Sequence, residues 1–444
     1  MKYKVGMISL GCAKNRVDAE MLLHKIENAG YELVSNIEEA DAVIVNTCGF
    51  IEDAKKESIE EIFNAVREKE NKESKLKAVI VTGCLAERYK HELMQEIPEL
   101  DAVVGIGANS NIVDVLNKSL IGEKIELYDE KNNMPMDDER VQTTPVHYAY
   151  LKIADGCDNR CTYCAIPLIR GNFRSRKMEN IISEAESLAK NGVKELLVIA
   201  QDTTRYGEDL YGKIMLVPLL KELCKIDGIK WIRILYCYPD RITDELLDLI
   251  ASEEKILNYI DLPLQHCNGK ILKSMNRRGG IETLTELIKK IREKVKDVII
   301  RTTFICGFPG ESEKEFEELA EFINDIKFER MGCFAYSKEE DTPAFNLSEQ
   351  IDDIEKMKRC DIIMREQSKI MEEYCNKQIG KVIKVIVDEY DDDKNVYYCR
   401  SIADSPDIDG GVIVHNSNKN FSPGEFVDVK ITDYNECDLI GEIN

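Results

Sequence analysis

Three cysteines lie close together in the stretch GCDNRCTYCAI, which covers residues 156–166. Cys157, Cys161 and Cys164 follow the spacing C-x3-C-x2-C, so one short loop can turn all three thiols toward a common point. A closed structural zinc site uses four protein ligands, and a simple iron–sulfur cluster also takes four thiolates. Three thiols therefore need a fourth ligand from elsewhere, or they leave one metal position open. An open position indicates a catalytic rather than a structural metal site.

Two other interpretations of these cysteines stay open. Positions i, i+4 and i+7 share one face of a helix, so the thiols could be small buried side chains of a helix. Gly156, Asp158 and Asn159 favour a loop instead, because such residues compete with helical backbone hydrogen bonds or lack a side chain. A zinc site that is completed by a distant ligand also fits the spacing.

A second set of cysteines is spread through the first hundred residues. Cys12 follows the run ISLG, Cys48 follows VIVNT and Cys84 follows VIVTG, so each comes directly after a predicted strand. Taken singly, each is typical of a core residue. Taken together, they indicate a second three-thiolate cluster, because the carboxyl ends of neighbouring parallel strands meet at one crevice. Glycines adjoin all three and allow close backbone approach to a bulky inorganic group: Gly11, Gly49 and Gly83.

The elements that must position the second set belong to an α/β domain. Apolar runs of strand length cover residues 4–10, 41–46, 77–83 and 101–107, and amphipathic segments such as 53–70 alternate with them. This alternation is typical of a parallel sheet covered by helices. We place this domain at residues 1–120. Residues 121–143 lose the periodicity and gather Asn, Pro and acids, which predicts an exposed linker.

The first set of cysteines belongs to a second domain, residues 144–375. Six strand-like runs alternate with helical segments, so the sequence predicts an open or partial (βα)6 barrel. These runs are residues 148–153, 195–200, 231–236, 259–264, 298–304 and 331–337. Active sites of such folds lie at the carboxyl ends of the strands. The C-x3-C-x2-C loop follows the first strand and is therefore expected at that mouth.

The last part of the chain, residues 376–444, changes to a period of two after a long helix at about 350–375. Short alternating runs separated by turns predict a small all-β barrel. The fold class is thus α/β, with an N-terminal parallel-sheet domain, a central partial barrel and a small β barrel.

Composition limits the class of protein further. The chain has 444 residues, 15 of them Cys, and no run approaches 18 apolar residues, so we expect a cytoplasmic protein without a membrane span. The first residues lack the pattern of a signal peptide. In a reducing compartment clustered cysteines are metal ligands or catalytic groups rather than disulfides. The net charge of −23 makes nucleic acid an unlikely partner and suits a basic protein.

With both cysteine sets and all three parts in place, the whole chain resembles the radical S-adenosylmethionine (SAM) methylthiotransferases, whose C-terminal barrel is a TRAM domain. The resemblance implies that Cys157, Cys161 and Cys164 bind one 4Fe-4S cluster, whose open iron takes the amino and carboxylate groups of SAM. It also implies an auxiliary 4Fe-4S cluster on the other three cysteines, Cys12, Cys48 and Cys84.

The chemistry implied by the resemblance is radical. Reductive cleavage of SAM gives a 5′-deoxyadenosyl radical that abstracts hydrogen from an unactivated carbon, the auxiliary cluster delivers sulfur, and a second SAM supplies the methyl group. An electron donor is an implied partner. The protein positions the cofactors and excludes side reactions. No catalytic residue is indicated beyond the cluster ligands.

Within the family, the runs SLGCAKNRVDAE, VNTCGFI and DGCDNRCTYCAIPLIRG resemble the RimO branch, as does CRSIADSPDIDGGV in the last domain. That branch methylthiolates the β-carbon of an aspartate in small-subunit ribosomal protein S-twelve. The alternative is the branch that modifies tRNA adenosine, from whose usual Gly-Cys-Asn-Asn this chain departs at Asp158. More remote alternatives are an electron carrier and a zinc or iron–sulfur binding module without catalysis.

Charge also bears on the partner of the C-terminal domain. Residues 376–444 contain 14 Asp and Glu against 7 Lys and Arg, a net charge of −7. A surface that grips RNA should be basic, whereas an acidic one complements a basic ribosomal protein. We therefore predict that the TRAM domain recruits ribosomal protein S-twelve. A merely solvated acidic face is the alternative.

Polar residues at the ends of other strands are candidates for binding SAM. Gln201 and Asp202 end the second barrel strand, and Gln265 and His266 end the fourth. Arg301 and Gly307 lie on the fifth. All six are predicted to point toward the barrel mouth. His266 could instead be a hydrogen-bonded structural residue, and Arg301 could be half of an ion pair.

Overall fold

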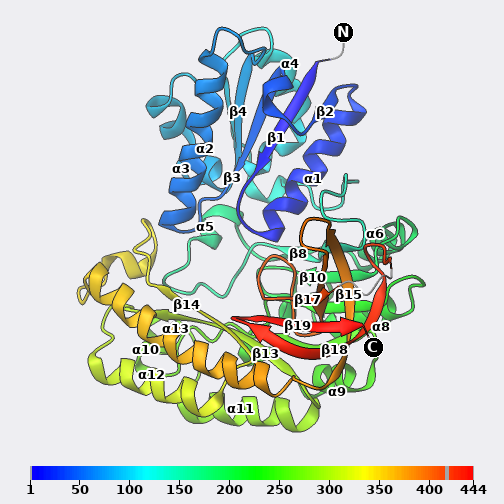
Figure 1. Cartoon of the computed structure of the whole chain (residues 1–444). Helices are drawn as coiled ribbons and strands as arrows, with labels where there is room; N and C mark the ends of the chain where they lie inside the picture. Colours follow the sequence, from blue (N-terminus) through cyan, green and yellow to red (C-terminus); the bar gives the residue numbers. More distant parts are fainter. Residues whose placement is uncertain (1–2, 416–419, 444) are drawn as a thin grey trace. The chain divides into compact units, whose positions relative to one another are not determined.

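The structure, a computed structural model, describes residues 3–415 and 420–443 (Figure 1). The chain forms two compact units, each made of segments that are distant in sequence. The first unit contains residues 3–143, 152–176 and 337–345, and the second contains 144–151, 177–336 and the described part of 346–443. The domain boundaries given above stay predictions.

The first unit is built on a six-stranded parallel sheet, in the order β2-β1-β3-β4-β5-β6. The strands are β1 (Lys4–Ser9), β2 (Glu32–Val34), β3 (Ala42–Thr47), β4 (Ala78–Gly83), β5 (Ala102–Val104) and β6 (Ile125–Leu127). All four strands predicted in this region are present. The two edge strands, β2 and β6, have three residues each, which is too short for a recognisable period of two.

Helices cover both faces of this sheet, which explains why β3 and β4 are buried at every position. The helices are α1 (Ala13–Asn28), α2 (Glu52–Glu70), α3 (Cys84–Glu96) and α4 (Ile112–Ser119). Because side chains alternate along a strand, Val43 and Val45 pack with α2 and α3, whereas Ile44 packs with α1 and α4.

The expected linker is less exposed than its composition suggests. Glu20 on α1 is 1% exposed and needs polar partners in the protein interior. Arg140 forms an ion pair with it, and Thr143 donates a backbone hydrogen bond of 2.8 Å to its carboxylate. Met134 is buried as well. The expectation of an exposed segment was therefore wrong for Met134 and for the side chain of Arg140, whereas Thr143 is exposed.

The second unit contains a parallel sheet in the order β14-β13-β12-β11-β10-β7, so all six predicted strands are confirmed. They are β7 (Tyr148–Lys152), β10 (Glu195–Ile199), β11 (Trp231–Ile234), β12 (Ile256–Asp261), β13 (Ile299–Cys306) and β14 (Arg330–Ala335). The helices between them are α6 (Met178–Lys190), α8 (Leu216–Cys224), α9 (Asp244–Ser252), α11 (Ile281–Lys294) and α12 (Glu313–Ile326). Strand β12 ends earlier than predicted, since Pro263 lacks the N–H that a sheet ladder needs.

The long helix α13 (Asp353–Asn376) packs along β14 and leads into a closed barrel, in the order β15-β16-β17-β19-β18. Its strands are β15 (Val382–Asp391), β16 (Val396–Ser401), β17 (Val412–His415), β18 (Phe426–Asn435) and β19 (Asp438–Ile443). Strands β18 and β19 pair antiparallel, and Glu436 between them has a left-handed conformation at the turn. The predicted fold class is confirmed.

Buried charges join this barrel to the parallel sheet of the same unit. Glu195, the first residue of β10, pairs with Arg400, and Arg330, the first residue of β14, pairs with Asp404 at 2.6 Å. The hydroxyl of Tyr259 donates a 2.7 Å hydrogen bond to Asp409. Residues 400–409 thus cover the amino-terminal ends of the sheet strands. In residues 3–415 and 420–443, no helix has the length and apolar character needed to cross a membrane.

Candidate functional site

The first unit brings Cys12, Cys48 and Cys84 to one edge of its sheet. They follow β1, β3 and β4, which are neighbours in the sheet, and Cys12 and Cys84 also stand where α1 and α3 begin. Gly11 has φ 84°, and a Cβ built there would lie 2.8 Å from the Cβ of Cys48. Only glycine allows this approach, so the backbone leaves the sulfurs room to converge.

These thiols are electrostatically linked. Burial and the neighbouring Cys84 raise the pKa of Cys48 to about 12, and burial also raises the pKa of Cys84. Desolvation would raise the pKa of Cys12 too, but the charges of Lys14 and Arg170 outweigh it and lower that pKa. Three thiolates gathered here are therefore stable only beside a strong positive charge, which a bound metal cluster supplies.

The residues of the C-x3-C-x2-C motif form a loop between β8 (Ala154–Asp155) and α5 (Ile166–Arg170). All three cysteines are half-buried. Gly156, with φ 77°, opens the loop because a Cβ there would lie 2.1 Å from the carbonyl oxygen of Asn172. The N–H of Cys157 donates to the carbonyl of Gly171 at 3.1 Å. The helical interpretation was therefore wrong, and the donor set of three thiols on one loop fits a cluster with one open iron.

A buried arginine that the sequence analysis missed connects the two cysteine sets of this unit. Arg170 at the end of α5 lies 2.8 Å from Asp18 of α1 and 2.9 Å from Asp155 of β8. Its guanidinium also donates to the sulfur of Cys84 at 3.6 Å. Lys152 pairs with the same two carboxylates. The only sequence signal was a charged residue directly after the apolar run IPLI.

This network keeps the carboxylate of Asp155 ionised. Burial opposes ionisation of Asp155, but Arg170 and Lys152 together hold its pKa well below the usual range. Arg170 therefore links Asp155, which directly precedes the loop of one trio, to Cys84 of the other trio. A guanidinium that donates to a thiolate orients it and withdraws charge from it.

Replacing Arg170 with Gln is expected to destabilise the first unit by about 3 kcal/mol, because Asp18 and Asp155 would share only Lys152 in a buried site. Urea denaturation followed by circular dichroism measures this. The matched control is Arg67→Gln on the exposed side of α2, which should change stability by less than about 0.5 kcal/mol. Equal effects of the two variants would contradict the role of the network.

In the second unit, Gln201 and Asp202 follow β10 directly, as predicted. Asp202 is buried, accepts a 2.6 Å hydrogen bond from the hydroxyl of Thr204, and lies 3.6 Å from Arg241. Gln265 follows β12 with φ 70° and donates its N–H to the carbonyl of Thr303 at 2.8 Å. Their contact with SAM stays a prediction.

His266 and Gly307 lie around one buried carboxylate. The Nδ1 of His266 accepts the backbone N–H groups of Cys267 and Asn268, and its Nε2 lies 3.3 Å from Glu311. The N–H of Gly307 donates to Glu311 at 3.0 Å. This geometry supports the structural interpretation of His266.

Arg301 lies on β13, the fifth strand, as predicted, but near the amino-terminal end of that strand. It is the third of eight residues in β13, and its guanidinium lies 2.9 Å from Asp261 and 3.5 Å from Asp409. These two carboxylates hold the side chain toward the C-terminal barrel. The alternative interpretation of Arg301 as half of an ion pair therefore describes its position.

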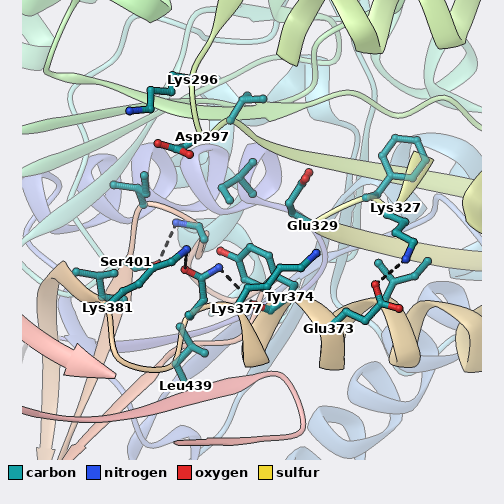
Figure 2. A pocket seen from close by; sticks show the side chains of 18 of the residues that line it. Lys296, Asp297, Lys327, Glu329, Glu373, Tyr374, Lys377, Lys381, Ser401 and Leu439 are labelled. Carbon is teal, nitrogen blue, oxygen red and sulfur yellow. Dashed lines mark hydrogen bonds and ion pairs between the residues drawn. The ribbon is translucent and has the colours of Figure 1, made fainter. Parts of the chain in front are cut away.

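A cavity of about 750 Å³ in the second unit is lined by none of the predicted site residues (Figure 2). It lies between α13, the start of β13 and the C-terminal barrel, and lysines surround it: Lys296, Lys327, Lys377, Lys381 and Lys384. Asp297, Glu329 and Glu373 line the same cavity, and Glu373 pairs with Lys327 at 2.6 Å. Its charge is therefore mixed, and we do not assign the reaction to it.

Comparison with known proteins follows the same three parts. Residues 4–105 match the model of the uncharacterized protein family UPF0004, residues 151–323 match the radical SAM superfamily, and residues 379–443 match the TRAM domain. The chain is 51% identical over 441 residues to a Clostridioides difficile protein named ribosomal protein uS12 methylthiotransferase RimO, covering 99% of this chain and 98% of that protein. A protein of the same name from Thermoanaerobacter sp. is 48% identical and covers 99% of each chain.

The chain belongs to the RimO family of radical SAM methylthiotransferases. Among solved structures, the Kitasatospora setae radical SAM methyltransferase TsrM aligns with a TM-score of 0.54 at 14% identity, covering 75% of this chain and 73% of that one, which shows the fold alone. Family membership confirms the predicted family, the enzyme class and the cofactors, SAM and iron–sulfur clusters. The interpretations as an electron carrier or a non-catalytic metal-binding module were wrong. The assignment of individual residues to the cofactors stays a prediction.

Proposed function

We propose that this enzyme adds a methylthio group to the β-carbon of an aspartate in ribosomal protein uS12, the protein S-twelve of the small subunit. The observation that carries the proposal is the identity of about half the residues, over 98% or more of both chains, to proteins named for this activity. Both cysteine trios lie in segments that the family models match.

The two cysteine trios would each hold one cluster with its own role. Cys157, Cys161 and Cys164 would hold the cluster that binds SAM, on a loop that Gly156 bends. The other trio would hold the auxiliary cluster at the edge of the first sheet. When bound, SAM and the two clusters would together supply a radical, a sulfur atom and, from a second SAM, a methyl group. Arg170 would position Cys84 and keep its thiolate form favourable, since its guanidinium already donates to that sulfur.

Only some of the acidic residues of the C-terminal barrel can face a basic partner, so the surface available for recruitment is smaller than the net charge suggests. Asp404 and Asp409 serve internal contacts with Arg330 and Tyr259 and cannot face a partner. Asp392 and Asp393, in contrast, are exposed at the turn between β15 and β16. We infer that this acidic hairpin tip meets the positively charged surface of uS12.

The function is tested with enzyme carrying both clusters, SAM and a chemical reductant in place of the physiological electron donor. Intact uS12, a peptide from its loop and tRNA are offered separately, and mass spectrometry locates any methylthio group. We expect modification of the aspartate in uS12 and no change in tRNA. Methylthioadenosine in tRNA with an unmodified aspartate would overturn the proposal in favour of the tRNA branch.

The same assay tests the hairpin tip. Asp392→Lys combined with Asp393→Lys should raise KM for intact uS12 about tenfold with little change in kcat, because charges at an interface rim act mainly on encounter. The control pair, Asp433→Lys with Glu436→Lys, changes the charge equally on the β18–β19 hairpin. The control pair should leave KM for uS12 unchanged. The rise in KM caused by the first pair should fade above about 0.15 M salt, where the Debye length falls below about 8 Å. Equal responses of the two pairs would reject the hairpin tip as the docking surface.

A further inference from the structure

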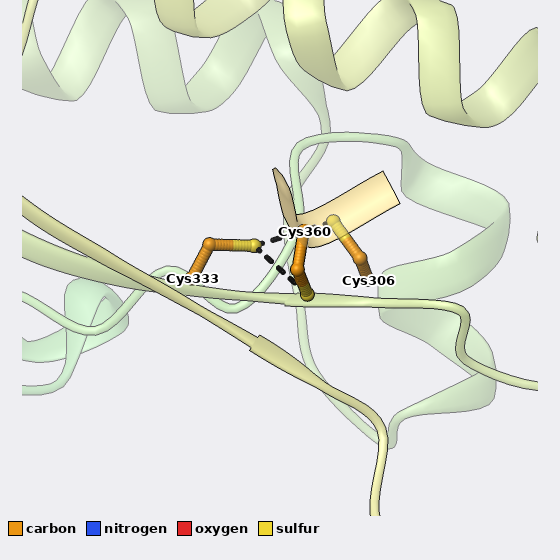
Figure 3. Close-up of side chains that lie close together, drawn as sticks. All are labelled: Cys306, Cys333 and Cys360. Carbon is orange, nitrogen blue, oxygen red and sulfur yellow. Dashed lines mark hydrogen bonds between the residues drawn. The ribbon is translucent and has the colours of Figure 1, made fainter. Parts of the chain in front are cut away.

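Three cysteines outside both predicted trios converge in the second unit (Figure 3). The sulfur of Cys333 lies 3.3 Å from that of Cys306 and 3.6 Å from that of Cys360, and all three sulfurs lie within 4.8 Å of one another. Cys306 is buried, and the other two are half-buried. The residues come from three elements: β13, β14 and α13.

The sheet period places this group away from the barrel interior. Cys306 and Phe304 lie two residues apart on β13 and therefore share a face. Phe304 packs edge-to-face against Phe322 of α12, so that face is the one covered by helices. Cys333 is the register partner of Phe304 on β14, and α13 brings Cys360 onto the same face. The three thiols thus lie on the opposite face from Arg301 and its ion pairs.

The spacing fits one metal ion rather than a cluster. Three thiolates bound to a single tetrahedral ion at about 2.3 Å stand about 3.8 Å apart. The observed sulfur separations need only small adjustments to reach that value. In a 4Fe-4S cluster each thiolate takes a different iron, so its sulfurs must stand much farther apart.

The protein around the three thiols does not by itself favour ionisation of all of them. Hydrogen bonds from Cys306 and Cys333 lower the pKa of the Cys360 thiol, whereas the hydrogen bonds of Cys306 with Cys333 and Cys360 raise the pKa of Cys306. Glu311 faces the group and opposes ionisation of Cys333 and Cys360. Arg359, which adjoins Cys360, pairs with Glu311 at 2.7 Å, and the buried Lys356 lies one turn earlier on α13. A divalent cation would displace the remaining thiol protons.

We propose that Cys306, Cys333 and Cys360 bind one Zn²⁺ ion, with water in the fourth position, at a site separate from the radical chemistry. Zn²⁺ accepts thiolate ligands, has no redox chemistry of its own and suits a tetrahedral site. The ion fastens α13 to β13 and β14. Because α13 leads into the C-terminal barrel, the site fixes the connection between the sheet and that barrel.

The test uses the enzyme with both clusters in place, so that those cysteines are occupied. After incubation with Zn²⁺ and dialysis, we expect one zinc per chain beyond the iron, and zinc-edge X-ray absorption should show three sulfur neighbours at about 2.3 Å. Cys333→Ser and Cys360→Ser should each weaken zinc binding by more than about 100-fold, since loss of outer partners alone costs 10–100-fold. The matched control, Cys224→Ser, also replaces a half-buried cysteine and should keep the zinc.

A measurement on the unsubstituted protein does not depend on whether the variants fold. Bound Zn²⁺ should protect Cys333 and Cys360 from alkylation, as read by peptide mass spectrometry, while Cys224 reacts equally with and without the metal. Absence of retained zinc, equal retention by all variants, or a Cys306–Cys333 disulfide in protein that excludes zinc would each overturn the proposal. None of these measurements depends on methylthio transfer.

Discussion

Replacing Cys157, Cys161 and Cys164 with Ala is expected to abolish SAM cleavage altogether. Replacing Cys12, Cys48 and Cys84 is expected to leave cleavage measurable while removing methylthio transfer. The first trio lies on one half-buried loop, and its three thiols would leave one iron of a cluster open for SAM. The second trio lies at the ends of three separate strands of the other cysteine site. Chromatography of 5′-deoxyadenosine and mass spectrometry of uS12 measure the two activities separately.

The matched control for both triple variants is Cys224→Ala with Cys437→Ala, which removes thiols that belong to neither trio. It should keep both activities and the full iron content. Each triple variant should lose about half of the iron, as two independent 4Fe-4S clusters require. If both triple variants lost cleavage equally while circular dichroism showed native folding, the assignment of separate roles would be wrong.

Deleting residues 376–444 is expected to prevent the second unit from folding, rather than merely to remove a partner-binding domain. Arg330 would lose Asp404, its carboxylate partner, while Glu195 would lose Arg400 and keep only Arg233; all of these side chains are buried. The abandoned buried charge of Arg330 alone costs about 3–5 kcal/mol, a large part of the 5–15 kcal/mol that stabilises a typical domain. Circular dichroism, soluble yield and SAM cleavage measure the outcome.

A charge-only control separates folding from recruitment. The Asp392→Lys and Asp393→Lys pair changes the exposed hairpin tip and should leave thermal unfolding and SAM cleavage in the absence of uS12 unchanged. A truncated chain that still folds and cleaves SAM at the full rate would show that the buried ion pairs contribute little.

Much of this protein could be predicted from short-range patterns. The strands β3, β4 and β10 appear as largely apolar runs because each is buried at every position. The six cysteines of the two trios stood out because each lies directly after a strand or within one loop. Such positions depend on spacing along the chain, which sequence shows directly.

Other features depend on which distant residues meet, and only the tertiary structure decided them. In the sequence, Arg170 is a single charged residue after an apolar run. Its partner Asp18 lies 152 positions away, so only the tertiary structure shows the ion pair. The same holds for Arg301 with Asp409. Cys306, Cys333 and Cys360 are separated by 27 residues in each interval and follow no motif spacing. They converge because strand register and the packing of α13 place them together, and no local period records a contact between elements.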